Sequence, residues 1–328
     1  MSSMNLLPNP DVAPDSPPIL HAKPADDPAS WAAEHHDTLR ALVREHGGVL
    51  VRGLGLSDPA TTEAVFRRLT SGLMPDREPF APRRSYGGGV YSTTKWPPNQ
   101  QMCMHHEVSY GLEFPGLLLF ACLEAPATGG ATALADASAV LRDLPRELVS
   151  RFEREGWLLT RAYHEEIGAS VQEAFGTDDR AAVERYCRRH AIEFAWQSDG
   201  SLHTRQRRSA VLRHPDSGLP CWFNQIAFLN EWTMEPEVHE YLVEMYGADG
   251  LPFNTRFGDG DPIDADVVGT INEVYDAHTV REPWQDGDLL LVDNIRTAHS
   301  REPFEGPREV LAALGNPVAR TDGEVSGV

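Results

Sequence analysis

The sequence is poor in lysine and in basic charge generally. Only two of its 29 basic residues are lysines, Lys23 and Lys95, which we interpret as a coding bias rather than a binding feature. The basic residues are outnumbered by 49 acidic ones, and the formal net charge is -20. Because no basic stripe is present to offset phosphate charge, the composition argues against a nucleic-acid partner.

Cysteines and long apolar runs are also scarce. The absence of a C-x-x-C pair argues against a zinc knuckle or a disulfide framework, and we expect buried thiols. No run of eighteen apolar residues occurs, and the N-terminus lacks the charged-then-apolar pattern of a secretion signal. We therefore predict a soluble, cytoplasmic protein with no membrane partner. The four cysteines are widely spaced, at Cys103, Cys122, Cys187 and Cys221.

The 328 residues, 41% of them hydrophobic, can fill the core of one large domain. Residues 1–28 are rich in Pro and Asp and predict an extended or partly disordered arm. Residues 29–316 predict a single domain, and 317–328 a flexible tail.

Strands interleaved with helices fit a mainly β fold with α (α+β), a double-stranded β-helix or jelly roll with flanking and inserted helices. Helices are expected at 31–46, from Pro59 onward, and at 139–155, 178–190, 236–246 and 263–280, which places helical insertions around 139–200 and 235–282.

Short His-x-acid pairs, which can supply two ligands to one metal ion, occur four times. They are His35 with Asp37, His105 with Glu107, His164 with Glu166, and His214 with Asp216. His35 lies on an amphipathic helix, where residues two apart point to different faces, so we expect a solvated surface. His214 enters a Pro-Asp-Ser-Gly turn and predicts a hairpin tip. His164 follows a strand but enters a loop, which indicates a structural or substrate-side role.

The pair formed by His105 and Glu107 has a strand-like context. Residues 101–104 and 108–110 flank it, and a second apolar strand is expected at 117–122. On a strand, residues two apart share a face and lie roughly 6.6 Å apart, at about 3.3 Å rise per residue. We therefore predict that both side chains lie on one strand and can chelate one ion.

A histidine and an arginine near the C-terminus complete the pattern. His299 follows a buried strand at 287–294 by a few residues. Together with His105 and Glu107 it would form a facial triad, which holds non-haem Fe(II) and leaves positions open for substrate and O2. Arg308 precedes the next strand, and its planar fork of donors suits one carboxylate of a dicarboxylate co-substrate.

With these motifs in their order, the chain resembles the taurine dioxygenase/TfdA family of Fe(II)- and 2-oxoglutarate-dependent oxygenases, over about residues 47–314. It is most similar to the syringomycin-type aspartyl β-hydroxylases, which occur with nonribosomal peptide assembly lines and act on amino acids, some of them carrier-bound. The segments that carry the resemblance are 47–53, 104–110, 129–132 with Ala135-Asp136, 221–225, 292–294, 299–301 and 306–308.

The resemblance implies that His105, Glu107 and His299 ligate Fe(II), and that Arg308 and the Thr132 hydroxyl hold the distal carboxylate of 2-oxoglutarate. Without it, Thr132 would be interpreted as an ordinary turn residue. The resemblance also implies hydroxylation of an unactivated C–H bond of an amino acid or a derivative of one, in specialised metabolite biosynthesis. The substrate would be free or bound to a peptidyl carrier protein, O2 would be consumed, and succinate and CO2 would be released.

Three departures from the family pattern carry information. His106 stands where many relatives have asparagine, and on a strand its side chain would face away from the metal. A contact that supports the metal ligands, a substrate contact and simple packing stay open for it. Ala312 replaces a second arginine of the taurine-type enzymes, which argues against taurine as the substrate. Glu107 is retained, whereas related halogenases lose this carboxylate, so hydroxylation is favoured over halogenation.

The substrate-binding residues are less clearly indicated. Arg301 could bind a substrate carboxylate or form a surface ion pair with a nearby glutamate. Residues 86–89, Tyr-Gly-Gly-Gly, predict a flexible loop that is either an active-site lid or a plain connector. Further candidates are Asn224, Gln225, Thr93 and His106.

Two other functional classes stay open. A zinc hydrolase can also use two histidines and a carboxylate, although it would need neither Arg308 nor Thr132. A non-catalytic binding module would be expected to have lost a ligand, whereas the set is complete. Within the oxygenase class, desaturation or cyclisation is the alternative to hydroxylation.

Overall fold

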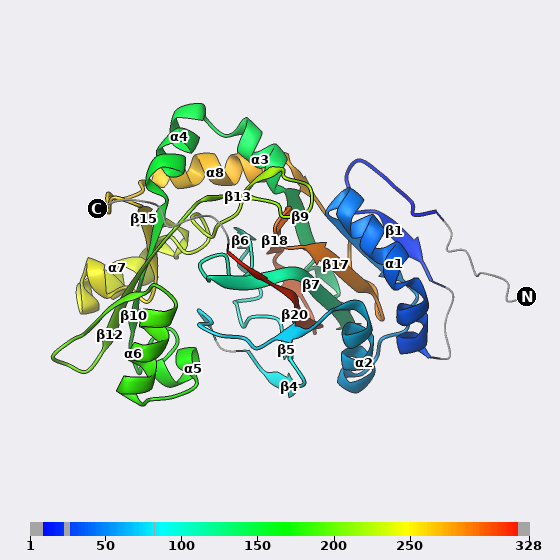
Figure 1. Ribbon diagram of the computed structural model, residues 1–328, viewed down its shortest axis with the longest axis horizontal. Coiled ribbons are helices and arrows are strands. Elements are labelled where there is room, and N and C mark those ends of the chain that lie inside the picture. Colours follow the sequence, from blue (N-terminus) through cyan, green and yellow to red (C-terminus); the bar gives the residue numbers. More distant parts are fainter. Residues whose placement is uncertain (1–8, 23–26, 82, 321–328) are drawn as a thin grey trace, which may run out of the picture.

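Two facing sheets form the jelly roll that the sequence predicts (Figure 1). The computed structural model describes residues 9–22, 27–81 and 83–320. The smaller sheet is antiparallel, in the order β16 (Thr279–Val280), β9 (Thr132–Asp136), β18 (Thr297–Arg301) and β6 (Met102–His105). The larger sheet runs in the order β1 (Ile19–His21), β2 (Gly48–Arg52), β17 (Leu289–Asp293), β7 (Glu113–Glu124), β20 (Glu309–Ala319), β5 (Val90–Ser92) and β4 (Ser85–Gly87), with β3 (Leu73–Met74) also paired to β20.

The strands of the larger sheet are apolar on both faces because both faces are covered. Along β7, Leu118 and Phe120 pack towards the smaller sheet, and the alternating Leu117 and Leu119 pack against the helical layer. That layer consists of α1 (Pro28–His46) and α2 (Pro59–Leu69). Each leucine buried in this way stabilises the fold by roughly 1.5–3 kcal/mol relative to exposure. The result is a rigid platform behind the strands of the smaller sheet.

The end of α1 is fastened to the strand that carries the distal histidine. Gly47 ends the helix in the left-handed region, with φ 80°, which favours glycine. A Cβ atom at Gly47 would lie 2.3 Å from the Thr297 hydroxyl oxygen. That hydroxyl donates to the Gly47 carbonyl oxygen at 3.0 Å. The tight contact thus sets the start of β18.

Both predicted N-terminal helices form, but one detail is wrong. Asp27 and Asp58 accept hydrogen bonds from the first-turn amides of α1 and α2, each of which has proline in its first turn. His35 is buried rather than solvated, with 6% exposure, because its ring packs edge to face against Trp31 with the centroids 4.7 Å apart.

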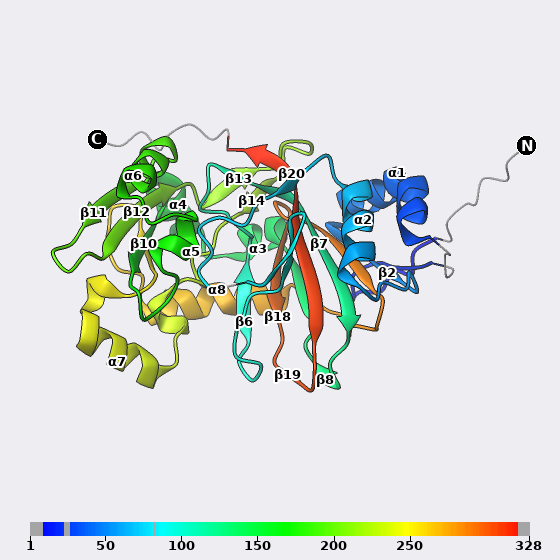
Figure 2. The same cartoon turned by 90° about the horizontal axis from the view of Figure 1, so that it is seen from below.

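A long insertion between β9 and β16 covers the far side of the jelly roll. Figure 2 shows it on the side away from α1 and α2. It contains a sheet of its own, which the sequence did not predict as such, in the order β11 (Glu193–Trp196), β12 (Leu202–Arg208), β10 (Trp157–Tyr163) and β15 (Asn254–Phe257). It also contains a hairpin of β13 (Val211–Arg213) and β14 (Pro220–Trp222). Its helices are α3 (Ala137–Asp143), α4 (Arg146–Glu155), α5 (Val171–Phe175), α6 (Arg180–Arg189), α7 (Pro236–Tyr246) and α8 (Ala265–Ala277).

Several predicted boundaries shift. The helix expected at 139–155 is two helices, because the residue before Pro145 leaves the helical conformation (Leu144, ψ 147°). Within the predicted arm, β1 pairs with β2, and β20 runs to Ala319, beyond the predicted domain end. Residues 86–89 belong to the β4–β5 hairpin, and β5 pairs with β20.

Among the described residues, no helix is both long and apolar enough to cross a membrane.

Candidate metal centre

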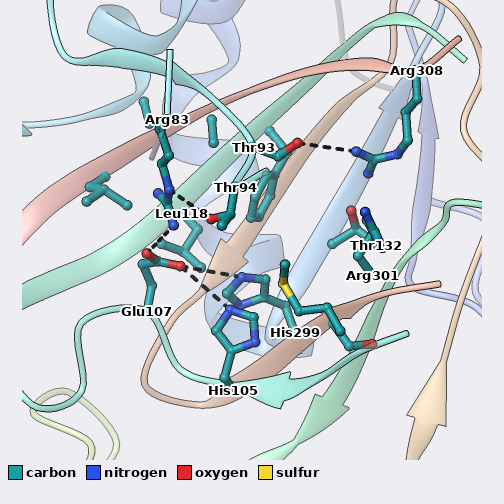
Figure 3. A pocket seen from close by; sticks show the side chains of 16 residues that line it. Arg83, Thr93, Thr94, His105, Glu107, Leu118, Thr132, His299, Arg301 and Arg308 are labelled. Carbon is teal, nitrogen blue, oxygen red and sulfur yellow. Dashed lines mark hydrogen bonds and ion pairs between the residues drawn. The ribbon is translucent and has the colours of Figure 1, made fainter. Parts of the chain in front are cut away.

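The structure brings together His105, Glu107 and His299, the three residues singled out as metal ligands (Figure 3). His105 and His299 are directly opposite each other on the antiparallel strands β6 and β18, so both imidazoles lie on one face. Each Nε2 atom is 3.7 Å from Oε2 of Glu107. One potential ligand atom from each side chain lies within 4.8 Å of the others, and all three residues are buried.

The sequence predicted that His105 and Glu107 lie on one strand, and this is wrong for Glu107. β6 ends at His105, and Glu107 lies in a turn in which Val108 has φ 55°. Asn294 holds this turn: its Oδ1 accepts from the Glu107 amide at 2.8 Å and its Nδ2 donates to the Glu107 carbonyl oxygen at 2.9 Å. The Glu107 carboxylate is therefore positioned by a turn that the buried Asn294 side chain holds. It is not positioned by the alternation of side chains along a strand.

The hydrogen bonds of the first imidazole favour metal binding through Nε2. His105 Nδ1 lies 2.8 Å from the Cys103 carbonyl oxygen, to which it can only donate. That tautomer leaves the lone pair on Nε2, which faces Glu107. Burial, followed by repulsion from His105, holds the pKa of His299 well below its usual value, so its ring is neutral. The Nε2 atoms of both rings thus face the same oxygen of Glu107.

Arg83 is the residue at this site that the sequence did not indicate. Its Nη2 donates to Glu107 Oε1 at 2.6 Å, and its Nε donates to the Thr94 hydroxyl at 3.0 Å. Burial alone would raise the pKa of Glu107, but Arg83 and the two imidazoles outweigh it and hold that pKa well below its usual value. No motif surrounds Arg83, and it is paired with a residue 24 positions away, so only the fold reveals the contact.

Arg308 lies at the opposite end of the same pocket. Its Nε donates to the Gly130 carbonyl oxygen at 3.0 Å and its Nη1 donates to the Thr93 hydroxyl at 3.3 Å. Among the described residues no carboxylate is paired with it. Burial and the nearby Arg301 lower the pKa of Arg308 to about 10. A largely buried cation without a counter-charge fits an anionic ligand.

Glycine at position 130 allows this approach. Gly130 has φ 71°, and a Cβ atom there would lie 3.2 Å from Cδ of Arg308 and 2.9 Å from Cβ of Phe304. A larger residue would displace the arginine side chain that the Gly130 carbonyl oxygen holds.

A pocket lies between the two ends, and side chains of both ends line it. Thr132 and Arg301, which are cross-strand neighbours, also line it. Apolar walls come from β7 and β20 and include Ala312. A donor set of two imidazoles and one carboxylate beside a pocket fits Fe(II) bound by a facial triad.

Arg301 lines the pocket, but both of its Nη groups donate to the protein. Its guanidinium donates to the backbone carbonyl oxygens of Trp96, Pro97 and Gln100. It is buried, and the alternative of a surface ion pair is wrong, since Glu302 is paired with Arg281 at 2.9 Å. Arg301 thus fastens the 96–100 segment to β18.

Three predicted substrate contacts lie outside the pocket. His106 is fully buried, and its Nδ1 lies 2.6 Å from the Asn294 carbonyl oxygen. Burial lowers its pKa to about 4. Gln225 donates to the His106 carbonyl oxygen at 2.8 Å, and Asn224 donates to the Ala210 carbonyl oxygen at 3.1 Å. The His106 and Gln225 side chains thus bind the backbone beside the turn of Glu107, the Asn224 side chain binds the backbone of the insertion, and none of the three lines the pocket.

The other His-x-acid pairs have structural partners. His214 lies at the end of the β13–β14 hairpin, as predicted, with Nε2 2.9 Å from the Asp293 carboxylate. His164 Nε2 lies 2.9 Å from the Gly250 carbonyl oxygen.

Comparisons with known proteins agree on one family. The model of the taurine catabolism dioxygenase TauD, TfdA family matches residues 15–314. The dapdiamide synthesis protein DdaC of Enterobacter agglomerans is 34% identical over 283 residues, which cover 86% of each chain. A clavaminate synthase-like protein of Arabidopsis thaliana is 31% identical over 291 residues, 84% of this chain and 83% of its own.

Solved structures share the fold at lower identity. PvcB from Pseudomonas aeruginosa, an Fe, alpha-ketoglutarate dependent oxygenase from an isonitrile synthetic pathway, has a TM-score of 0.52 at 16% identity, with 92% of this chain and 86% of its own covered. AAD-2 in complex with Mn(II) and N-oxalylglycine has a TM-score of 0.53 at 13% identity, with 96% and 99% covered. These likenesses support the jelly-roll fold.

Proposed function

Because the chain belongs to the taurine catabolism dioxygenase TauD, TfdA family of Fe(II)- and 2-oxoglutarate-dependent oxygenases, we propose that His105, Glu107 and His299 bind its Fe(II). We further propose that it hydroxylates an unactivated C–H bond of an amino acid or an amino-acid-derived substrate. When bound, Fe(II) and 2-oxoglutarate supply the oxidant from O2, with release of succinate and CO2. The observation that carries the proposal is the convergence of the three side chains on one buried pocket.

Arg308 and Thr132 are proposed to hold the distal carboxylate of 2-oxoglutarate. In support, Arg308 is a largely buried cation with two donors already oriented by Gly130 and Thr93, and Thr132 lines the same pocket. A guanidinium fixed in this way can bind a carboxylate through charge-assisted hydrogen bonds. The protein's part is therefore to orient the co-substrate and to keep water away from it.

Two residues favour hydroxylation of a substrate other than taurine. Glu107 is present and oriented towards both imidazoles, so the carboxylate that related halogenases lack is available here. Ala312 lines the pocket, and its methyl side chain offers no positive charge to a sulfonate. Family membership argues against the zinc hydrolase and the binding module.

A role in specialised metabolism is part of the proposal. It is supported by the likeness to DdaC, a dapdiamide synthesis protein. The substrate is a free amino acid or one carried by a peptidyl carrier protein.

A cytoplasmic location is supported by the four cysteines, all of which are free thiols.

The proposal is tested by succinate release under air, with Fe(II) and 2-oxoglutarate, across free amino acids and carrier-bound aminoacyl groups. We expect one class to stimulate release in the wild type and none to do so in His105→Ala. The proposal is contradicted if no substrate stimulates release and His105→Ala retains whatever activity the wild type has.

A further inference from the structure

We propose that Arg83 is a positioning residue, which holds Glu107 so that only one carboxylate oxygen faces the metal site. The inference rests on the proposed function, because it concerns the same Fe(II) site. It assigns a role to a residue that touches neither of the two imidazoles.

The two oxygens of Glu107 have different partners. Oε1 accepts from Arg83 Nη2 at 2.6 Å, whereas Oε2 is 3.7 Å from Nε2 of both His105 and His299 (Figure 3). Carboxylates can bind metal ions through one oxygen or through both. Because Oε1 is engaged in a short charge-assisted hydrogen bond, Oε2 is the oxygen left for the metal.

Arg83 is itself held in place. Its Nε donates to the Thr94 hydroxyl at 3.0 Å and lies 3.7 Å from the Asp76 carboxylate. Its side chain is only 7% exposed. The guanidinium therefore has a fixed orientation from which it can restrain the rotation of Glu107.

The segment that precedes Arg83 is fastened to the inserted sheet. The guanidinium of Arg161, on β10, donates to the carbonyl oxygens of Glu78 and Pro79, both at 2.8 Å. The Glu78 carbonyl oxygen also accepts from the Tyr110 hydroxyl at 2.9 Å. Through these contacts the insertion supports the position of a residue that acts on the metal ligand.

The consequence concerns the open coordination positions. If Glu107 turned to bind with both oxygens, it would occupy a position that 2-oxoglutarate and O2 need. Metal affinity alone is a weak test of this, because removing Arg83 also removes a positive charge that repels the metal ion. Binding of 2-oxoglutarate to the metal-loaded protein reports the open position directly.

The test compares Arg83→Gln with the wild type, both loaded with Mn(II). We expect 2-oxoglutarate to bind about 10- to 100-fold more weakly to the variant, the range typical of lost partners of metal ligands. We also expect a shifted charge-transfer absorption of the anaerobic Fe(II)–2-oxoglutarate complex, which a loss of global stability would not produce. Arg83→Lys, which keeps the charge but not the fork, should restore part of the affinity.

Two further variants separate positioning from general damage. Thr94→Val keeps Arg83 but removes the hydroxyl that accepts a hydrogen bond from Arg83 Nε. We expect it to lose less affinity for 2-oxoglutarate than Arg83→Gln does. Arg84→Gln is the matched control, because Arg84 is exposed and its guanidinium packs over Tyr86, 4.8 Å from the ring centroid. It should bind 2-oxoglutarate as the wild type does.

The inference is overturned if Arg83→Gln binds 2-oxoglutarate with wild-type affinity and an unchanged absorption band, or if Arg84→Gln loses as much. A different result overturns the proposed function. In that case the wild type would bind no Mn(II), or His299→Ala would bind it equally well.

Discussion

The two ends of the pocket differ in how the protein balances its charges. At the metal end, Glu107 is paired with Arg83, which also lies near Asp76. At the other end, Arg308 and Arg301 approach each other, and among the described residues neither is paired with a carboxylate. One end thus presents a carboxylate oxygen beside two imidazoles, whereas the other presents positive charge without a carboxylate partner. This difference predicts a cation at one end and an anion at the other.

Removing a ligand from the metal end should have the largest effect. In His299→Ala the triad retains one imidazole and one carboxylate, and we expect Mn(II) binding and substrate-dependent succinate release both to fall below detection. Electron paramagnetic resonance of Mn(II) measures the first directly. Wild-type binding in this variant would mean that the metal lies elsewhere.

Removing the charge from the other end should leave the metal in place. We expect Arg308→Gln to raise the Kd for 2-oxoglutarate roughly 10- to 100-fold, which corresponds to a charged hydrogen bond of about 1.5–3 kcal/mol. Calorimetry on Mn(II)-loaded protein measures it. Unchanged 2-oxoglutarate affinity, or a matching loss of Mn(II) affinity, would contradict the separation of the two ends.

Loosening the turn of Glu107 should weaken the metal end without changing its charge. Asn294→Ala removes buried hydrogen bonds to the Glu107 amide and carbonyl groups. We expect the free energy of unfolding to fall by about 1–3 kcal/mol, together with weaker Mn(II) binding. Gln225→Ala, which loses one contact to the His106 carbonyl oxygen, should bind Mn(II) almost normally. Equal losses of Mn(II) affinity in the two variants would contradict the role of Asn294 in holding the turn of Glu107.

The smallest effect is expected outside the pocket, at His214. Its hydrogen bond with Asp293 raises the pKa of His214 above the usual value of 6.5. The protonated ring therefore stabilises the folded state fully below about pH 6.5, and this stabilisation is lost as the pH rises through the raised pKa. The difference in unfolding free energy between wild type and His214→Gln should shrink from pH 6 to pH 8 in denaturant titrations. A constant difference would contradict it.

The sequence singled out the three side chains that converge at the pocket better than it indicated the residues that hold them. His105, His299 and Arg308 could be found because imidazoles and arginines next to buried strands are unusual. Arg83 could not, because its contact with Glu107 joins two segments that only the fold brings together, and the insertion anchors the chain before it at Glu78 and Pro79. The position of Glu107 was right for the wrong reason, since a turn replaces the expected strand.

Burial was harder to predict than element type. The jelly roll and most helices follow from apolar periodicity and from caps such as Asp27 and Asp58. Periodicity does not tell which polar residues are buried, and so Asn224, Gln225 and His106 were taken for substrate contacts. Their polar groups instead bind backbone carbonyl groups that lie far away in the sequence.

The most direct test of the two-ended pocket is an anaerobic titration of the Fe(II)-loaded protein with 2-oxoglutarate. A visible charge-transfer absorption arises only when the co-substrate binds the iron itself. We predict that the band appears in the wild type, is absent in His299→Ala, and needs higher 2-oxoglutarate concentrations in Arg308→Gln. A wild type that binds Fe(II) and 2-oxoglutarate without this band would contradict a shared site.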